Sequence, residues 1–287
     1  MRALLIGLLW CVLPSTHAVE LRRTELPAVA IPGQLWVGQT EPGASVVLDG
    51  RMLRVDRAGT FVFGLGRDIQ GSIGVDVRYP NGDSKHFDIP VQPREFAIER
   101  VDGLAESTVN PVPKLAERIA REQALVAKAR ERDDDRQDFR FGFIWPNSGR
   151  ISGVYGSQRI LNGTPKNPHY GVDIAVPAGT PIHAPADGIV SFVHNDLYLT
   201  GGTVLIDHGH GLSSVFVHMS RIDVKAEQRI AMGQVIGAVG ATGRATGPHL
   251  HWGMNWFETR LDPQLVAGPM PAPGSPEVGK PVRLLRQ

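Results

Sequence analysis

The stretch Gly247-Pro248-His249-Leu250-His251-Trp252 carries two histidines separated by one apolar residue. In a β-strand, alternate side chains share a face and their Cα atoms lie about 6.6 Å apart, so both imidazoles can enter one cleft while Leu250 points to the core. In a helix the same two side chains would point to nearly opposite sides. The hexapeptide therefore predicts a strand that delivers two histidines to one site.

A second pair, His169 and Asp173, lies about 80 residues earlier, with three residues between its members. Fully extended, this segment would hold the two Cα atoms about 13 Å apart, too far to share an ion with bonds near 2 Å, so the chain must bend between them. Gly171 can provide that bend. Imidazole and carboxylate are good zinc donors, and three protein ligands with one open position are typical of catalytic zinc. For either pair alone, turn histidines near an aspartate remain the alternative.

Three segments together resemble the lysostaphin and LytM-type zinc metallopeptidases: His169-x-x-x-Asp173, residues 215–220 and residues 240–251. The resemblance covers about residues 146–265. It implies one Zn²⁺ per chain, held by His169, Asp173 and His251, with water in the fourth position.

The same resemblance implies that His218 and His249 are catalytic histidines that do not bind the metal. One imidazole can take a proton from the water while the other steadies the oxyanion or protonates the leaving amine. The sequence does not assign the general base to either. Arg159 and Asn162 precede His169 in the region where the family shapes its groove, and we expect them to bind substrate.

The function implied by the resemblance is that of an exported zinc metallo-endopeptidase acting on peptidoglycan stem peptides or cross-links. Family members cut Gly-Gly bridges or D-Ala to diaminopimelate cross-links, and the motifs do not choose between these bonds. One alternative is a catalytically inactive LytM-type activator of a cell-wall amidase, although such domains usually lose metal ligands. A general secreted protease acting on proteins is another.

Other histidines have structural interpretations. His208 and His210 lie at a hairpin signal, Asp207-His208-Gly209-His210-Gly211, and we expect a turn or groove-wall role rather than metal binding. His183 and His194 are expected to be structural.

The whole chain is expected to be mainly β, because its 33 Gly and 22 Pro separate short apolar runs. A small N-terminal β-sandwich is predicted over 19–92, a linker with a helix over 93–140, an antiparallel β catalytic domain of the LytM type over 141–268, and a Pro-rich tail over 269–287. Pro111 or Pro113 would start the helix, and its charged run 131–136 is read as a solvated end. The predicted N-terminal strands are 34–39, 45–48, 52–55, 60–63, 72–79 and 85–89.

Composition excludes other classes of protein. A formal net charge of +1 gives no electrostatic footprint for nucleic acid. Cys11 is the sole cysteine, so no disulfide can stabilise the exported chain.

Residues 1–18 have the layout of a secretory signal peptide, with cleavage expected after Ala18. The apolar run 3–13 is shorter than the roughly 20 residues that span a bilayer, so a permanent anchor is the less favoured alternative. We therefore expect a periplasmic protein of a Gram-negative bacterium, with peptidoglycan as its partner and no membrane span after cleavage. D-Ala cross-links would follow from that setting, and the N-terminal domain is hypothesised to restrain access to the zinc.

Overall fold

The computed structural model describes residues 23–272 and 279–281, so the predicted signal peptide and most of the predicted tail lie outside the described residues. The described chain is mainly β, as expected. Within it, no helix is both long and apolar enough to cross a membrane.

The N-terminal region forms two antiparallel sheets, one of two strands and one of four. In the larger sheet, Ile73, Val75 and Val77 are buried while the residues between them are more exposed, the two-residue period of a strand with one buried face. The strands agree with the sequence prediction except that the third is shorter. They are β1 (Leu35–Gln39), β2 (Ser45–Leu48), β3 (Arg51–Met52), β4 (Thr60–Gly64), β5 (Ser72–Arg78) and β6 (Ser84–Pro90).

The C-terminal region is built on a larger antiparallel sheet with the strand order β17-β13-β14-β15-β19-β11-β8, to which β20 is added beside β19. A second sheet, β12-β18-β16, belongs to the same region. The elements are β8 (Arg150–Gly153), β9 (Gln158–Leu161), β10 (Thr164–Pro165), β11 (Val172–Ala175), β12 (Pro181–His183), β13 (Gly188–Leu197), β14 (Gly201–Gly209), β15 (Leu212–Met219), β16 (Arg221–Ile222), β17 (Arg229–Ile230), β18 (Val235–Ala238), β19 (Leu250–Trp256), β20 (Thr259–Leu261) and the helix α3 (Pro263–Ala267).

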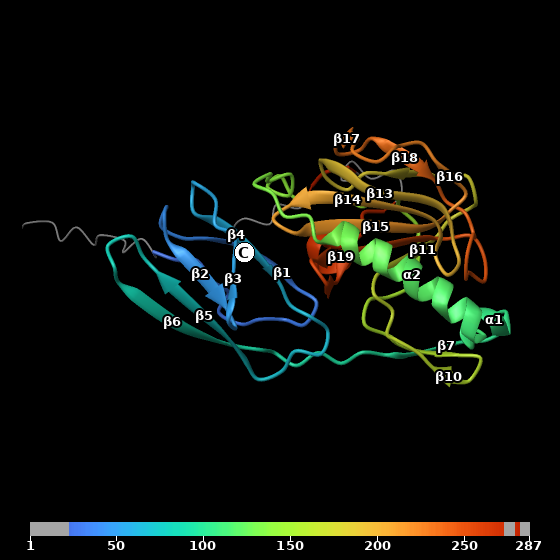
Figure 1. Ribbon diagram of the computed structural model, residues 1–287, viewed down its shortest axis with the longest axis horizontal. Helices are drawn as coiled ribbons and strands as arrows, with labels where there is room; N and C mark the ends of the chain where they lie inside the picture. Colours follow the sequence, from blue (N-terminus) through green and yellow to red (C-terminus); the bar gives the residue numbers. More distant parts are fainter. Residues whose placement is uncertain (1–22, 273–278, 282–287) are drawn as a thin grey trace, which may run out of the picture.

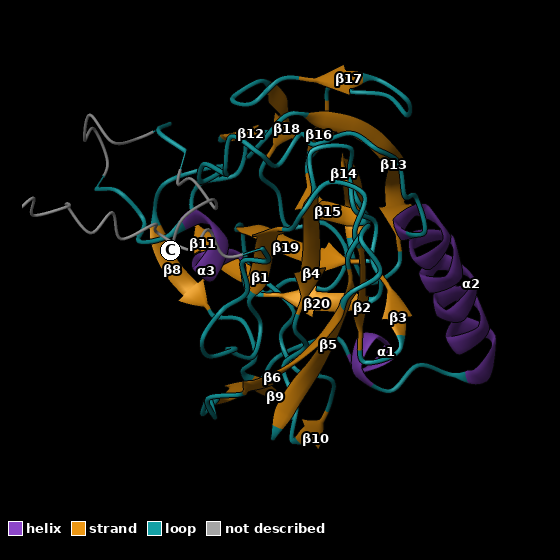
Figure 2. Cartoon of the chain, turned by 90° about the vertical axis from the view of Figure 1, so that its left-hand side faces the viewer, coloured by secondary structure: helices purple, strands orange, loops and turns teal. Residues whose placement is uncertain are grey.

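Between the two regions the chain forms β7 (Ile98–Val101), α1 (Glu106–Val109) and α2 (Pro113–Arg130). Pro113 occupies the first turn of α2, where its missing N–H leaves no helical hydrogen bond unmade. The helix lies across the large sheet (Figures 1 and 2), where Val126 packs against Val215 and Val217. β7 was not predicted, and it pairs in parallel with β9.

The charged run 131–136 is not a solvated helix end, because α2 stops at Arg130 and the run makes ionic contacts on both sides. Asp133 accepts a hydrogen bond from Arg54 of the N-terminal region at 2.7 Å. Arg136 pairs with the buried carboxylate of Asp207 on β14. The run therefore joins the two regions, which its composition did not reveal.

The two regions share a continuous hydrophobic core. β4 is buried on every residue because its second face meets the C-terminal sheet. A side chain at Gly64 would contact Leu261 and Trp256, which lie within 2.8 Å of a Cβ built there. The N-terminal sheets are thus packed on β19 and β20, at the opposite end of those strands from the histidine pair.

Candidate active site

Three adjacent strands, β8, β11 and β19, bring the predicted metal ligands together. Asp173 on β11 is paired in register with His251 on β19 and with Gly153 on β8. His169 stands just before β11 and is 2% exposed. The chain bends between His169 and Asp173 as the spacing required, so that both side chains reach His251.

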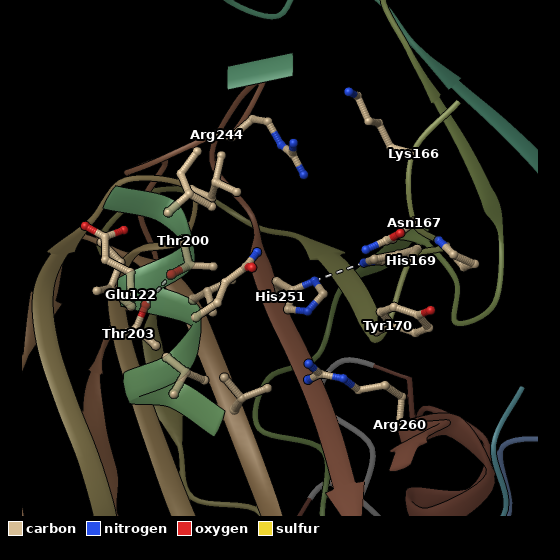
Figure 3. Close-up of a pocket in the computed structure, with 18 of the residues that line it drawn as sticks. Glu122, Lys166, Asn167, His169, Tyr170, Thr200, Thr203, Arg244, His251 and Arg260 are labelled. Atoms are coloured by element: carbon tan, nitrogen blue, oxygen red, sulfur yellow. Dashed lines mark hydrogen bonds between the residues drawn. The ribbon is translucent and has the colours of Figure 1, made fainter. Parts of the chain in front are cut away.

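The three candidate ligand atoms converge closely enough for one metal ion. Nδ1 of His251 lies 2.7 Å from Oδ1 of Asp173, and Nε2 of His169 lies 3.1 Å from the same oxygen. The two imidazole nitrogens are 2.9 Å apart (Figure 3). Donors around tetrahedral zinc, with bonds of about 2.05 Å, lie about 3.3 Å apart, so a small expansion of this triangle would hold the ion. Two imidazoles and a carboxylate are also the donor set of catalytic zinc sites.

Two glycines make this convergence possible by leaving space for the ligands. A Cβ at Gly171 would lie 2.7 Å from the His251 ring and 2.6 Å from the carbonyl oxygen of Trp252. A Cβ at Gly153 would lie 2.5 Å from Oδ2 of Asp173. Gly171 is thus required for close approach of the strands rather than for a positive φ.

Backbone carbonyls fix the tautomer of three of the four site histidines. Nδ1 of His169 is 3.1 Å from the carbonyl oxygen of Val154, Nδ1 of His218 is 2.7 Å from that of Thr242, and Nδ1 of His249 is 2.8 Å from that of Gly247. A carbonyl oxygen only accepts, so each Nδ1 carries a hydrogen, and Nε2 is the nitrogen at which each ring can bind a metal or exchange a proton.

His218 and His249 lie beside the ligand triangle, with ring centroids 4.9 Å apart. Nε2 of His249 is 3.8 Å from Oδ1 of Asp173. His218 has φ of 61°, a left-handed conformation that costs a non-glycine residue free energy. Burial, and then repulsion from the two neighbouring imidazoles, lowers the pKa of His218 to about 3, so its ring is neutral near pH 7.

Asp173 and His251 have the protonation states that metal binding needs. Burial lowers the pKa of His251 to about 4, although its hydrogen bond with Asp173 acts in the opposite direction. For Asp173, burial would raise the pKa, but the hydrogen bonds with His169 and His251 outweigh it and hold the pKa well below its usual range. At neutral pH the pair is a carboxylate beside a neutral imidazole.

The two predicted substrate residues lie in different surroundings. Arg159 on β9 donates from Nη2 to Oδ2 of Asp173 at 3.0 Å and from Nε to Glu99 of β7 at 3.3 Å. Asn162 instead holds the backbone of Leu104 through both amide atoms, at 2.8 and 3.2 Å, and lines neither of the cavities described below. Its dipeptide, Asn162-Gly163, is the usual signature of a tight hairpin turn and predicts this location.

Two cavities adjoin the histidines. The larger, about 880 Å³, runs between α2 and the segment 165–170, with His251 on its floor (Figure 3). The smaller, about 270 Å³, lies beside His249 and is lined partly by Glu99, Val101 and Leu104. Among the described residues, none before Glu99 lines either cavity, so the linker and not the N-terminal sheets borders the site.

His208 and His210, for which the sequence predicts a turn or groove-wall role, lie away from the ligand triangle, and only His210 is in a turn. His208 on β14 is fully buried, with Nδ1 2.6 Å from the carbonyl oxygen of Asp187 and Nε2 2.9 Å from Oγ of Ser214. His210 occupies the turn after β14 with φ of 51° and packs edge-on against Phe139. Neither lines the two cavities.

Four charged residues that border the cavities were not predicted as site residues: Glu99, Arg130, Arg244 and Arg260. Three of them lie on elements without a recognisable motif, and Arg244 lies within the segment 240–251, where the resemblance assigns it no role. Only the fold brings these side chains to the same place as the histidines.

Comparison with known proteins gives consistent results. Residues 167–263 match the model of peptidase family M23. The peptidoglycan DD-endopeptidase ShyA of Vibrio cholerae is 42% identical over 104 residues, and the DD-carboxypeptidase/endopeptidase Mpg of Neisseria meningitidis is 41% identical over 103 residues. Each match covers 36% of this chain, and the chain spans about a quarter (24%) of the length of these curated relatives.

The similarity to a solved structure extends further along the chain. A protein from Pseudomonas aeruginosa assigned to peptidase M23 is 31% identical, with a TM-score of 0.62. The match covers 83% of this chain and 94% of the other. It therefore includes most of the region before residue 167 as well as the histidine site.

Proposed function

The chain belongs to peptidase family M23, and from that membership we propose that it is a zinc metallo-endopeptidase hydrolysing peptide bonds in peptidoglycan. The observation that carries the proposal is the convergence of His169, Asp173 and His251 in a triangle small enough to share one metal ion, with His218 and His249 beside it. Bound zinc would polarise the scissile carbonyl and lower the pKa of a water molecule.

His218 and His249 would move the protons of the reaction. Their Nε2 lone pairs are available because each Nδ1 hydrogen is engaged by a carbonyl. A ring that is neutral can accept the proton of the attacking water at Nε2, and a ring that carries a proton at Nε2 can donate a hydrogen bond to the developing oxyanion or that proton to the leaving amine. The carbonyls of Thr242 and Gly247 keep both rings oriented throughout these transfers.

We propose peptidoglycan as the substrate because the named relatives include DD-endopeptidases. D-Ala cross-links are the bond class that those names support. The proposed setting is the periplasm, reached through the signal predicted over residues 1–18. An inactive amidase activator is the less favoured reading, because the complete ligand triangle supports metal-dependent chemistry.

The first test measures zinc content and muropeptide release by the purified chain 19–287 and by two variants. We expect stoichiometric zinc and release of muropeptides from the unsubstituted protein. His251→Ala should lose both, whereas His249→Ala should keep zinc and lose release. No zinc and no release would instead support the amidase activator, and cleavage of casein without cleavage of wall would support a general protease.

We also propose that the linker, rather than the N-terminal sheets, restrains access to the site. Glu99 is bonded to Arg159, and Leu104 is bonded to Asn162 at the rim of the smaller cavity. Point substitutions test this better than a chain that begins near residue 141, because that truncation would also remove α2 and expose the apolar sheet beneath it.

Asn162→Ala should release Leu104 and raise the rate of muropeptide release. Arg100→Gln is the matched control, because Arg100 is exposed and follows Glu99 in the chain. This substitution should leave the rate unchanged. A folded Asn162→Ala protein with an unaltered rate would reject the restraint but not the peptidase.

A further inference from the structure

Arg130, the last residue of α2, is a buried cation without a counter-charge. It is 7% exposed and lines the larger cavity. Among the described residues, its Nε has no hydrogen-bond partner and its guanidinium has no carboxylate within 4.0 Å. A buried charge without a partner costs folding free energy unless a ligand of opposite charge binds it.

Arg260 on β20 lines the same cavity and adds a second guanidinium. Its Nη1 donates to Oδ1 of Asn255 at 2.7 Å, which orients the side chain but does not neutralise it. The guanidinium lies 5.6 Å from the ring centroid of Tyr170, the residue after His169. Figure 3 shows Arg260 beside Tyr170, on the other side of His251 from Arg244.

The charge of Arg260 disfavours the charged form of Arg130. Burial, and then the charge of Arg260, lowers the pKa of Arg130 to about 9. Burial also lowers the pKa of Arg260. The charge of Glu258 acts to raise the pKa of both arginines. In the described part of the chain, however, Glu258 forms no ion pair with either of them.

The other cations around the cavity each have at least one hydrogen-bond partner, and Arg244 donates from Nη1 to the carbonyl oxygen of Thr108 at 3.0 Å. Arg159 is bonded to Asp173 and Glu99, and Lys166 is bonded to the amide oxygen of Asn110. Among the described residues, Arg130 differs from these cations because its Nε has no hydrogen-bond partner, and its neighbour Arg260 has only a neutral amide as partner. An anion bound there would remove the repulsion and supply the missing partner.

We propose that Arg130 and Arg260 bind a carboxylate of the peptide substrate on the Tyr170 side of the metal ligands. The inference rests on the proposed peptidase function, because it assigns one end of that site to a substrate group. The planar guanidinium matches a carboxylate in geometry as well as in charge. Arg130 lies outside the matched region 167–263. The helix α2 would therefore contribute substrate preference to a candidate metal site that is built by strands.

The test measures binding of L-Ala-γ-D-Glu-meso-diaminopimelate-D-Ala with its carboxylates free and with every carboxylate amidated. The zinc-loaded His249→Ala protein is used, so that turnover does not obscure binding. We expect the free peptide to bind at least about tenfold more tightly, the range for charge-assisted hydrogen bonds. Arg130→Gln and Arg260→Gln, each added to this protein, should reduce that preference to about threefold or less.

Arg121→Gln is the matched control, since Arg121 is exposed on the same helix and lines neither cavity. It should leave the preference unchanged. Because Arg130 is buried, Arg260→Gln serves as the deciding variant if Arg130→Gln does not fold.

Equal binding of the two peptides would overturn the inference. So would an undiminished preference in Arg260→Gln, which would indicate that the carboxylate binds the metal or another group. Competition by sulfate or phosphate without any peptide preference would indicate a simple anion site and also overturn it. Muropeptide release by the unsubstituted chain is scored separately: release without a carboxylate preference contradicts only this inference, and preference without release contradicts only the peptidase function.

Discussion

The guanidinium of Arg159 and the carboxylate of Asp173 are joined by a hydrogen bond of 3.0 Å to Oδ2, while Oδ1 of the same carboxylate faces His169 and His251. Arg159 therefore orients a candidate metal ligand from behind. Its second contact, with Glu99, connects this ligand to β7. Arg159, which the sequence predicts to contact substrate, is thus also placed to orient Asp173 for metal binding.

Replacing Arg159 by Gln should weaken zinc affinity by about tenfold, because the carboxylate loses the partner that fixes its orientation. Competition with a chromogenic chelator measures this change. Arg159→Lys should restore part of the affinity, and Arg100→Gln is the control. Unchanged zinc affinity combined with a raised KM would assign Arg159 to the substrate alone.

Replacing His218 by Ala should lower kcat by about 10²- to 10⁴-fold, the usual contribution of a positioned acid or base. Zinc content should remain near one per chain, because His218 is outside the ligand triangle. Metal analysis and muropeptide release on the same sample measure both quantities. Loss of zinc in this variant would show that His218 supports the metal rather than the proton transfers.

The fully buried His208 predicts that stability falls as the medium becomes acidic. Burial lowers its folded-state pKa to about 4 from 6.5, so the unfolded chain binds the proton first as pH falls. Its contribution is present above pH 6.5 and is lost on approaching pH 4, amounting to about 2 kcal/mol between pH 7 and pH 5. Urea denaturation at these two pH values should show a smaller difference for His208→Gln. An identical difference would contradict the assignment.

The ion pair between Arg94 and Asp262 predicts a large cost when one partner is removed. Nη2 of Arg94 lies 2.6 Å from Oδ2 of Asp262, whose side chain is 1% exposed and also caps α3 through the backbone N–H of Gln264. Asp262→Ala should lower the free energy of unfolding by about 3 kcal/mol, because the cap and the buried partner are both lost. Asp262→Asn should cost less, since its side chain can still accept from the cap.

Urea denaturation measures both Asp262 variants. Asp83→Ala is the control, because Asp83 pairs with Arg23 on the exposed surface and its loss should change stability little. If Asp262→Ala cost no more than this control, the contact between Arg94 and the start of α3 would be dispensable.

The N-terminal strands could be predicted from sequence because each has a local signal, and the candidate ligand set was implied by the resemblance of three segments to a known family. β5 alternates buried and exposed residues, and His249 and His251 are spaced to share a strand face. β7 has no such signal, since Ile98 is 63% exposed and its pairing with β9 is made almost 60 residues away. Arg130 was missed because arginine near a helix end is usually solvated, and only tertiary packing buries it.

The helix α2 comes from upstream of the 167–263 match, yet it forms one wall of the cavity whose floor carries His251. The strands that carry the candidate metal ligands and Arg130, one of the two residues that we propose recognise substrate, therefore lie in separate parts of the sequence. A protein engineer could replace the groove-facing side chains of α2 while leaving every residue of the ligand triangle unchanged. Divergence by exchange of a helix, with the catalytic sheet kept constant, is the corresponding route open to evolution.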